Sequence, residues 1–302
     1  MVGYIYDPIF TEHGSQEHIE RPARVEVIDA VARTFPLQHY LVRKATKEEL
    51  KKIHEAHYVD WVERAYEEGY RFILNEDTLL TPKSFEVASY AAGSAIPIVD
   101  AFAKGEIKRA FLNLRPPGHH AERKTGQGFC IFNNIALMAR YAQSKGFGKV
   151  MIIDFDVHHG NGTQDIFYSD DTVCYFSTHE RNNYPYFTGS EEERGEGRGE
   201  GFNINKPYGD YCKDEELLQL YEDLPSWFDF DIVLISAGYD LMKDETISSA
   251  QITFEGLRAL VQKILQFAGN KPVAFLLEGG YNLDSLATSV TITLEELTKD
   301  EL

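Results

Sequence analysis

Short apolar segments recur along this chain, and several of them lead at once into polar, reactive residues. The run Val150–Ile153 carries no polar side chain and leads straight into Asp154 and Asp156. Strands with one face in water alternate apolar and polar residues, whereas strands of a parallel sheet covered by helices are apolar throughout. The pattern therefore predicts an α/β protein with a parallel sheet between two layers of helices.

Similar segments predict further strands, with helices between them. Besides Val150–Ile153, the predicted strands are Tyr4–Tyr6, Tyr40–Arg43, Ala110–Leu114, Val173–Phe176, Ile232–Ile235 and Val273–Leu277. The predicted helices include Val25–Phe35, Phe85–Ala103, Ile135–Ser144, Glu215–Trp227 and Phe254–Phe267. Pro97 predicts a kink in its helix. We expect one domain over residues 1–302, because a chain of this length can close around a single α/β core.

Charge and composition argue against two classes of partner. The chain has 48 acidic and 30 basic residues, and nucleic-acid binding depends on neutralising phosphates with Lys and Arg. Direct binding to nucleic acid is therefore not expected. Membrane association is not expected either, because no apolar run approaches the ~20 residues that span a bilayer. Cys130, Cys174 and Cys212 lack a C-x-x-C spacing, which favours a reducing, cytoplasmic location.

The residues after Val150–Ile153 have the chemistry of a metal site. Asp156 and His158 are two positions apart, so their side chains leave an extended chain on the same side. Carboxylate and imidazole suit zinc or a similar divalent ion. Asp240 follows the strand Ile232–Ile235 and would supply a third ligand, leaving a position open for water. A single Asp-x-His is as often a capped turn in solvent, so the hypothesis depends on several strand ends converging.

Two further strands end in reactive residues. Ala110–Leu114 is followed by Arg-Pro-Pro-Gly and then by His119 and His120, and Val273–Leu277 is followed by Glu-Gly-Gly and Tyr281. Parallel strands end at one edge of a sheet, where α/β proteins bind their ligands. We therefore expect these side chains to lie near the proposed metal ion.

Together these segments resemble the zinc-dependent histone deacetylase family, which includes bacterial deacetylase-like enzymes and acetylpolyamine amidohydrolases. The matching segments are Arg115–His120, Gly128–Cys130, Asp154–Thr163, Ser236–Asp240 and Glu278–Tyr281. The resemblance extends from about Tyr6 to Leu286, and Asn161 is similar to the class II branch. It implies the arginase–deacetylase fold, a single domain with a central parallel sheet of about eight strands sandwiched by helices.

The resemblance also implies a metal and a reaction. Asp156, His158 and Asp240 would bind one zinc ion, and Tyr281 would donate its hydroxyl to the amide oxygen of the substrate. The implied activity is removal of acetyl or other acyl groups from N-acetyl-lysine or related N-acetyl-alkylamines by metal-activated water. Acetylpolyamines and small amides remain alternative substrates, and iron and cobalt remain alternative metals. The number of chains that assemble is left open.

The two adjacent histidines would have partners of different charge. By resemblance, Asp154 orients His119 and Asn161 orients His120, and such partners set the tautomer and the basicity of a histidine. The carboxylate makes His119 the more readily protonated of the two. His120 is therefore expected to be the general base, with proton delivery to the leaving amine assigned to either histidine.

Further positions follow from the same resemblance. Gly128, Phe129 and Phe187 would flank the aliphatic stem of the substrate. Asp77 would hold the substrate backbone at the rim, and Arg24 would line an acetate-exit channel. A potassium ion would be held by the main-chain oxygens of Asp154, Asp156 and His158, together with Ser177 and Thr178.

One loop departs from the family pattern. Where the family commonly has Gly-Asp-Pro after Asp240, this chain has Leu241–Ile247. Ile247 falls near a position at which polyamine-selective members carry an acidic residue, which weakens a polyamine-specific interpretation. A two-metal site similar to arginase would need further carboxylates at Gly160 and Met242, so one metal is expected. A non-catalytic acyl-lysine binding protein is the alternative of another class, but it should have lost one of the catalytic residues.

Overall fold

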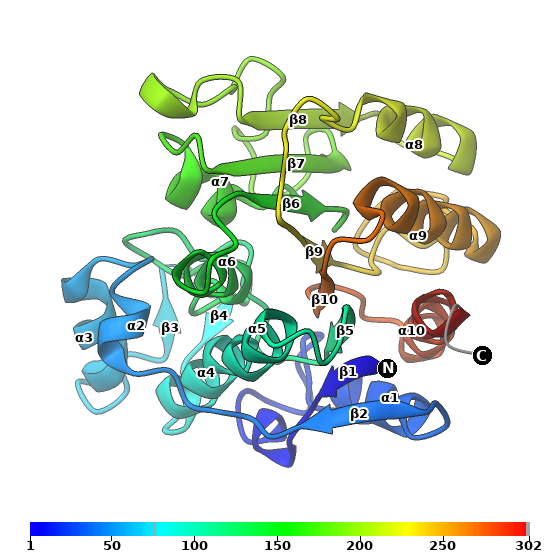
Figure 1. Cartoon of the computed structure of the whole chain (residues 1–302). Coiled ribbons are helices and arrows are strands. Elements are labelled where there is room, and N and C mark those ends of the chain that lie inside the picture. Colours follow the sequence, from blue (N-terminus) through cyan, green and yellow to red (C-terminus); the bar gives the residue numbers. More distant parts are fainter. Residues whose placement is uncertain (75–76, 300–302) are drawn as a thin grey trace.

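The computed structural model describes residues 1–74 and 77–299. Its centre is a sheet of eight strands in the order β2-β1-β5-β10-β9-β6-β7-β8 (Figure 1). The strands are Val2–Ile5 (β1), Leu37–Tyr40 (β2), Arg109–Leu112 (β5), Val150–Asp154 (β6), Val173–Glu180 (β7), Asn203–Tyr208 (β8), Ile232–Ala237 (β9) and Val273–Leu277 (β10). A separate antiparallel hairpin consists of Phe72–Ile73 (β3) and Thr78–Leu79 (β4).

Helices cover both faces of the sheet. They are Ala23–Ala32 (α1), Lys47–Leu50 (α2), Ala56–Ala65 (α3), Ser84–Gly93 (α4), Ala95–Ala103 (α5), Asn134–Ser144 (α6), Asn161–Phe167 (α7), Asp214–Leu220 (α8), Phe254–Ala268 (α9) and Leu283–Thr298 (α10). Helices α4 to α7 lie on one side of the sheet, and α1, α8, α9 and α10 pack in a row on the other (Figure 1). Within the described ranges, none of these helices combines the length and apolar character needed to cross a membrane.

The register of the central strands brings their carboxyl ends to one edge. All neighbouring strands of the large sheet pair in parallel, and Asp154 at the end of β6 pairs with Ser177 of β7 and Ser236 of β9. Every residue of β6, β7, β9 and β10 is buried. Polar residues that follow these strands are therefore held close together and shielded from water.

The predicted fold class is confirmed. The main differences between the predicted and the observed strands concern strands that are polar or exposed. The segment Tyr40–Arg43 shares only its first residue with β2, because Leu41 is 89% exposed and lies outside the sheet. The edge strand β8 is not predicted from the sequence. Its Asn203 and Asn205 look like loop residues, but both side-chain amides are buried and donate to Oε1 of Gln164 at 2.8 Å.

The predicted kinked helix Phe85–Ala103 is two helices. The break is at Ser94, three residues before Pro97, because proline has no N–H to donate to the carbonyl one turn earlier. Gly93 ends α4 where the backbone of residues 43–45 crosses it. A Cβ atom at this position would lie 2.2 Å from the carbonyl oxygen of Arg43 and 2.3 Å from the amide nitrogen of Ala45.

We expect Gly93→Ala to destabilise the protein, because the added methyl group would displace the crossing backbone rather than a flexible side chain. Overpacking of this kind costs about 1–3 kcal/mol, to be measured as the free energy of unfolding in urea. Gly148→Ala is the control, since the nearest atom to its new Cβ would be a carboxylate oxygen of Asp231 at 3.7 Å. Equal stability of the two variants would contradict the proposed close approach.

Candidate active site

Three potential metal ligands meet at the carboxyl edge of the sheet. Asp156 and His158 follow β6, and Asp240 follows β9. Their ligand atoms all lie within 4.8 Å of one another. Nδ1 of His158 is 3.0 Å from a carboxylate oxygen of Asp156 and 3.3 Å from one of Asp240. The structure thus brings together the three residues that the sequence predicted as ligands.

The surroundings of these ligands fit a cation. Oδ2 of Asp240 is buried, and among the residues that the structure describes it accepts no well-aligned hydrogen bond, although Nδ1 of His158 lies 3.3 Å away. Burial, reinforced by the charge of Asp156, raises the pKa of Asp240. Gly279 leaves space beside the group, since a Cβ atom there would lie 2.0 Å from Oδ2 of Asp240. Two buried carboxylates, one of them with an oxygen that accepts no well-aligned hydrogen bond, and a nearby imidazole form a suitable donor set for zinc.

Two adjacent histidines lie beside the metal-ligand group, each with its own partner. Nδ1 of His119 is 3.1 Å from Oδ2 of Asp154, and Nδ1 of His120 is 2.8 Å from Oδ1 of Asn161. The ring centroids of the histidines are 3.9 Å apart. The hydroxyl of Tyr175 also donates to Asp154 and holds that carboxylate in place. Each of the two histidines has the partner that the resemblance predicted.

The electrostatic environment separates the two histidines. Burial lowers the pKa of His119, but the nearby carboxylates of Asp156, Asp154 and Glu278 outweigh burial and raise it to about 10. Burial holds the pKa of His120 well below its usual range, and the positive charge of His119 lowers it further. These directions agree with a protonated His119 and a neutral His120, which is available as a base.

Glu278 fixes the main chain of the loop that carries His119 and His120. It is fully buried, and its Oε2 accepts hydrogen bonds from the main-chain N–H groups of Gly118 at 2.7 Å and His119 at 3.2 Å. Ser236 donates to its other oxygen. Burial raises the pKa of Glu278 to about 7. In the sequence, Glu278 was noted only as part of a motif and was given no role. Its contact with Gly118 joins residues 160 positions apart, and such a contact leaves no local pattern in a sequence.

Tyr281 is held in place by contacts with Phe129, Arg24 and Glu245. Its ring contacts Phe129 edge to face with centroids 6.0 Å apart, and the guanidinium of Arg24 lies 4.8 Å from its centroid. Arg24 also donates to the carbonyl oxygens of Gly280 and Glu278. Oε1 of Glu245 accepts from the main-chain N–H groups of Tyr281 and Asn282 at 2.8 and 2.9 Å. The unusual Leu241–Ile247 loop therefore contacts the tyrosine directly.

Gly128 and Phe129 form a wall beside the histidines. Both have positive φ angles, 54° and 69°, and a Cβ atom on Gly128 would lie 2.4 Å from the ring of His120. The amide of Phe129 donates to Oγ1 of Thr78, which in turn donates to Asp77. Asp77 is thereby connected to this wall. A role for Gly128, Phe129 and Asp77 in substrate binding stays a prediction.

The structure leaves Phe187 outside the group of side chains around the histidines, and a substrate contact there stays a prediction. Its side chain is fully exposed, and the loop that carries it has positive φ angles at Asn182, Tyr186 and Phe187. Tyr184, on the same loop, is the aromatic residue that lies near the histidines. Its ring centroid lies 5.1 Å from that of His120 and 6.3 Å from that of His158. Successive left-handed residues turn the chain in a way that hydrophobic pattern does not indicate.

Ser177 and Thr178 lie on β7, next to the end of β6. Oγ of Ser177 is 2.9 Å from Nδ1 of His179, and Oγ1 of Thr178 is 2.9 Å from the hydroxyl of Tyr221. The potassium site that involves these residues stays a prediction.

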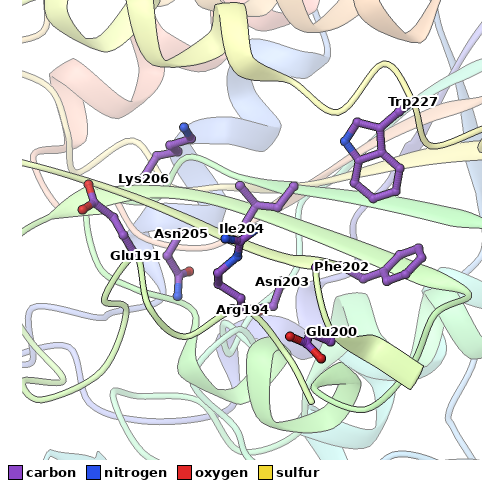
Figure 2. Close-up of a pocket in the computed structure, with 10 residues that line it drawn as sticks. Glu191, Arg194, Glu200, Phe202, Asn203, Ile204, Asn205, Lys206 and Trp227 are labelled. Atoms are coloured by element: carbon purple, nitrogen blue, oxygen red, sulfur yellow. The ribbon is translucent and has the colours of Figure 1, made fainter. Parts of the chain in front are cut away.

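A separate hollow of about 630 Å³ lies along the edge strand β8 (Figure 2). Trp227, 60% exposed, stands at one end of it, and charged residues of both signs line it, among them Glu191, Arg194 and Lys206. None of its lining residues belongs to the metal-ligand group or to the histidine pair. The reactive side chains therefore gather at the carboxyl edge of the sheet and not in this hollow.

Comparisons with known proteins agree on one family. Residues 18–297 match the family described as "Histone deacetylase domain". "Histone deacetylase 5" of Arabidopsis thaliana is 34% identical over an alignment 327 positions long, gaps included, which covers 99% of this chain and 49% of that protein. "Polyamine deacetylase HDAC10" of Homo sapiens is 36% identical over an alignment 307 positions long, gaps included, which covers 93% of this chain and 45% of that protein.

Solved structures show the same likeness. The crystal structure of the HDA15 HD domain has a TM-score of 0.91 and 33% identity, covering 99% of this chain and 88% of that one. This chain spans about half the length of the curated relatives named above.

We expect Asp240→Asn to weaken zinc binding, because a neutral amide replaces one of the two ligand carboxylates. Loss of a residue that only supports a ligand costs 10- to 100-fold in metal affinity, so loss of a ligand should cost at least about 100-fold. Titration of the metal-free protein with zinc measures this. Asp244→Asn, at an exposed position on the same loop, should bind as the wild type does. Unchanged affinity in Asp240→Asn would exclude it as a ligand.

Proposed function

The chain belongs to the histone deacetylase family, and from this we propose that it is a zinc-dependent amidohydrolase that removes acetyl groups from N-acetyl-lysine or related N-acetyl-alkylamines. The observation that carries the proposal is a buried Asp156–His158–Asp240 group beside two histidines with different partners. The chemistry that zinc supplies when bound is activation of water and polarisation of the acyl oxygen. The same proposal includes a potassium ion beside the zinc site, a cytoplasmic location for the protein, and acetylated lysines of proteins as substrates.

Each catalytic side chain has a distinct task in this reaction. His120 accepts a proton from the attacking water, which its low pKa permits because the ring is neutral at pH 7. His119 carries a positive charge balanced by Asp154 and lies in ring contact with its neighbour. Either histidine then protonates the leaving amine. Tyr281 donates its hydroxyl to the acyl oxygen as negative charge develops there.

Acetyl-lysine in a peptide is the favoured substrate class, and acetylpolyamine the second candidate. The relative named as a polyamine deacetylase makes polyamines relevant. A cationic polyamine would gain from a carboxylate at the mouth of the site, however, and the position that resembles the gatekeeper is occupied by the apolar Ile247. A non-catalytic acyl-lysine binding protein would need none of the paired histidine contacts that this chain retains.

Tyr281→Phe should bind zinc normally and lose most of its turnover. Removal of one donor to a developing oxyanion costs about 10²–10³ in kcat. The measurement is kcat on an acetyl-lysine peptide, together with zinc content. Tyr211→Phe, which removes an exposed hydroxyl, serves as the matched control. Wild-type turnover by Tyr281→Phe would reject the assigned role, and inactivity of the zinc-loaded wild type on every N-acetyl-alkylamine would reject the proposed function.

Ile247→Glu should shift the preference of the enzyme toward polyamines. A carboxylate at the mouth attracts a cationic substrate, and such steering changes association rates by about tenfold or more. The quantity to compare is kcat/KM for acetylspermidine divided by kcat/KM for an acetyl-lysine peptide. Thr246→Glu adds the same charge at the neighbouring exposed position and should have a smaller effect. A wild-type preference for acetylspermidine would contradict the peptide assignment.

A further inference from the structure

We propose that Glu122 is a positioning residue, which acts through Asn161 to hold His120 in the tautomer that a general base requires. The inference builds on the proposed function, because it concerns the side chain assigned as the base. It is carried by a chain of hydrogen bonds from a cavity at the protein surface to the histidine pair.

The chain of contacts begins at a cavity of about 520 Å³ that both Glu122 and Asn161 line. Glu122 is partly exposed there, and its Oε1 accepts a hydrogen bond from Nδ2 of Asn161 at 2.6 Å. Asn161 is 4% exposed at the start of α7. Its Oδ1 is 2.8 Å from Nδ1 of His120. One amide group therefore joins the carboxylate to the imidazole.

An amide can face a histidine in two ways, and only one of them suits a base. With its oxygen toward Nδ1, Asn161 requires a proton on Nδ1 and leaves Nε2 of His120 with a lone pair. With its NH₂ group toward Nδ1, the proton would move to Nε2 and the base would be lost. The two orientations have almost the same shape, so packing alone does not discriminate between them.

The carboxylate of Glu122 makes this choice, because an ionised carboxylate only accepts hydrogen bonds. It stabilises the NH₂ group of Asn161 on its own side and repels the amide oxygen. The oxygen must then face His120. The neighbouring His119 needs no such arrangement, since both oxygens of its partner Asp154 accept. A glutamine at position 122 would lack this selectivity, because it could present either its oxygen or its own NH₂ group.

Further contacts hold Glu122 itself in place. Its main-chain N–H donates to the carbonyl oxygen of Thr125, and its own carbonyl oxygen is 2.7 Å from Nδ1 of His54. Nε2 of Gln127 donates to the same carboxylate oxygen at 3.0 Å. Gln127 in turn accepts from the hydroxyl of Tyr184, whose ring packs edge-on against His120. The carboxylate thus supports both the amide behind the base and the wall beside it.

The first test is Glu122→Ala. Loss of a residue that orients a catalytic group should lower kcat by about 10- to 100-fold, with zinc content and KM for an acetyl-lysine peptide unchanged. Glu196→Ala is the matched control, because it removes an exposed carboxylate that lines the same cavity and bonds to Ser169. A wild-type kcat in Glu122→Ala, in a preparation whose wild type is active, would overturn the inference and leave the proposed function intact.

The second test separates orientation from a general structural role. Asn161→Asp supplies an acceptor that needs no orienting, so it should raise kcat in the Glu122→Ala background. In the wild-type background the same substitution puts a second carboxylate oxygen where Nδ2 of Asn161 now lies 2.6 Å from Oε1 of Glu122, and repulsion between the two charges should lower kcat. Effects of the same sign in both backgrounds would overturn the inference. If Glu122→Ala does not fold, Glu122→Gln decides, with an intermediate loss of kcat expected and no loss contradicting the proposal.

Discussion

The site depends on one physical constraint, the burial of several carboxylates at one edge of the sheet. Asp154, Asp156, Asp240 and Glu278 are all nearly inaccessible to water, and an uncompensated buried charge would cost several kcal/mol. Each therefore has a specific form of compensation. Asp154 has an imidazole and a tyrosine hydroxyl, Glu278 has main-chain amides and a serine, and the other two share an imidazole and the space for a cation.

This compensation is possible because parallel strands end together and because glycines follow them. The loops after β9 and β10 must approach the ligand carboxylates very closely. A Cβ atom on Gly238 would lie 2.0 Å from Oδ2 of Asp156, and one on Gly279 would lie 2.0 Å from Oδ2 of Asp240. The amide of Gly279 uses this proximity to donate to Asp156 at 2.9 Å. Because the main chain lies so close to Asp156 and Asp240, no residue larger than glycine fits at positions 238 and 279.

The parts of the site that could be predicted are those with a local signal. Asp156 and His158 follow an apolar strand at a spacing of two, so their common direction was readable from the sequence. The exposed position of Phe187 was not readable from the sequence, because its loop contains three non-glycine residues with positive φ, which no pattern of apolar residues indicates. Tyr184 was overlooked for the same reason. β8 was missed because its asparagines are buried through hydrogen bonds rather than through apolar packing.

By itself, the sequence determined the fold class and pointed to Asp156, His158 and the paired histidines as candidate site residues, since apolar runs and short spacings are properties of neighbouring residues. Only the tertiary structure decided what supports them. Glu278 reaches Gly118 across 160 residues, Glu122 reaches Asn161 across 39, and Glu245 reaches Tyr281 across 36. Such contacts depend on how separate loops meet at the sheet edge, and hydrogen-bond geometry between distant loops leaves no periodic trace in a sequence. The strand that leads into Asp154 and Asp156 could therefore be recognised from the sequence. The three glutamates that support the neighbouring loops could not.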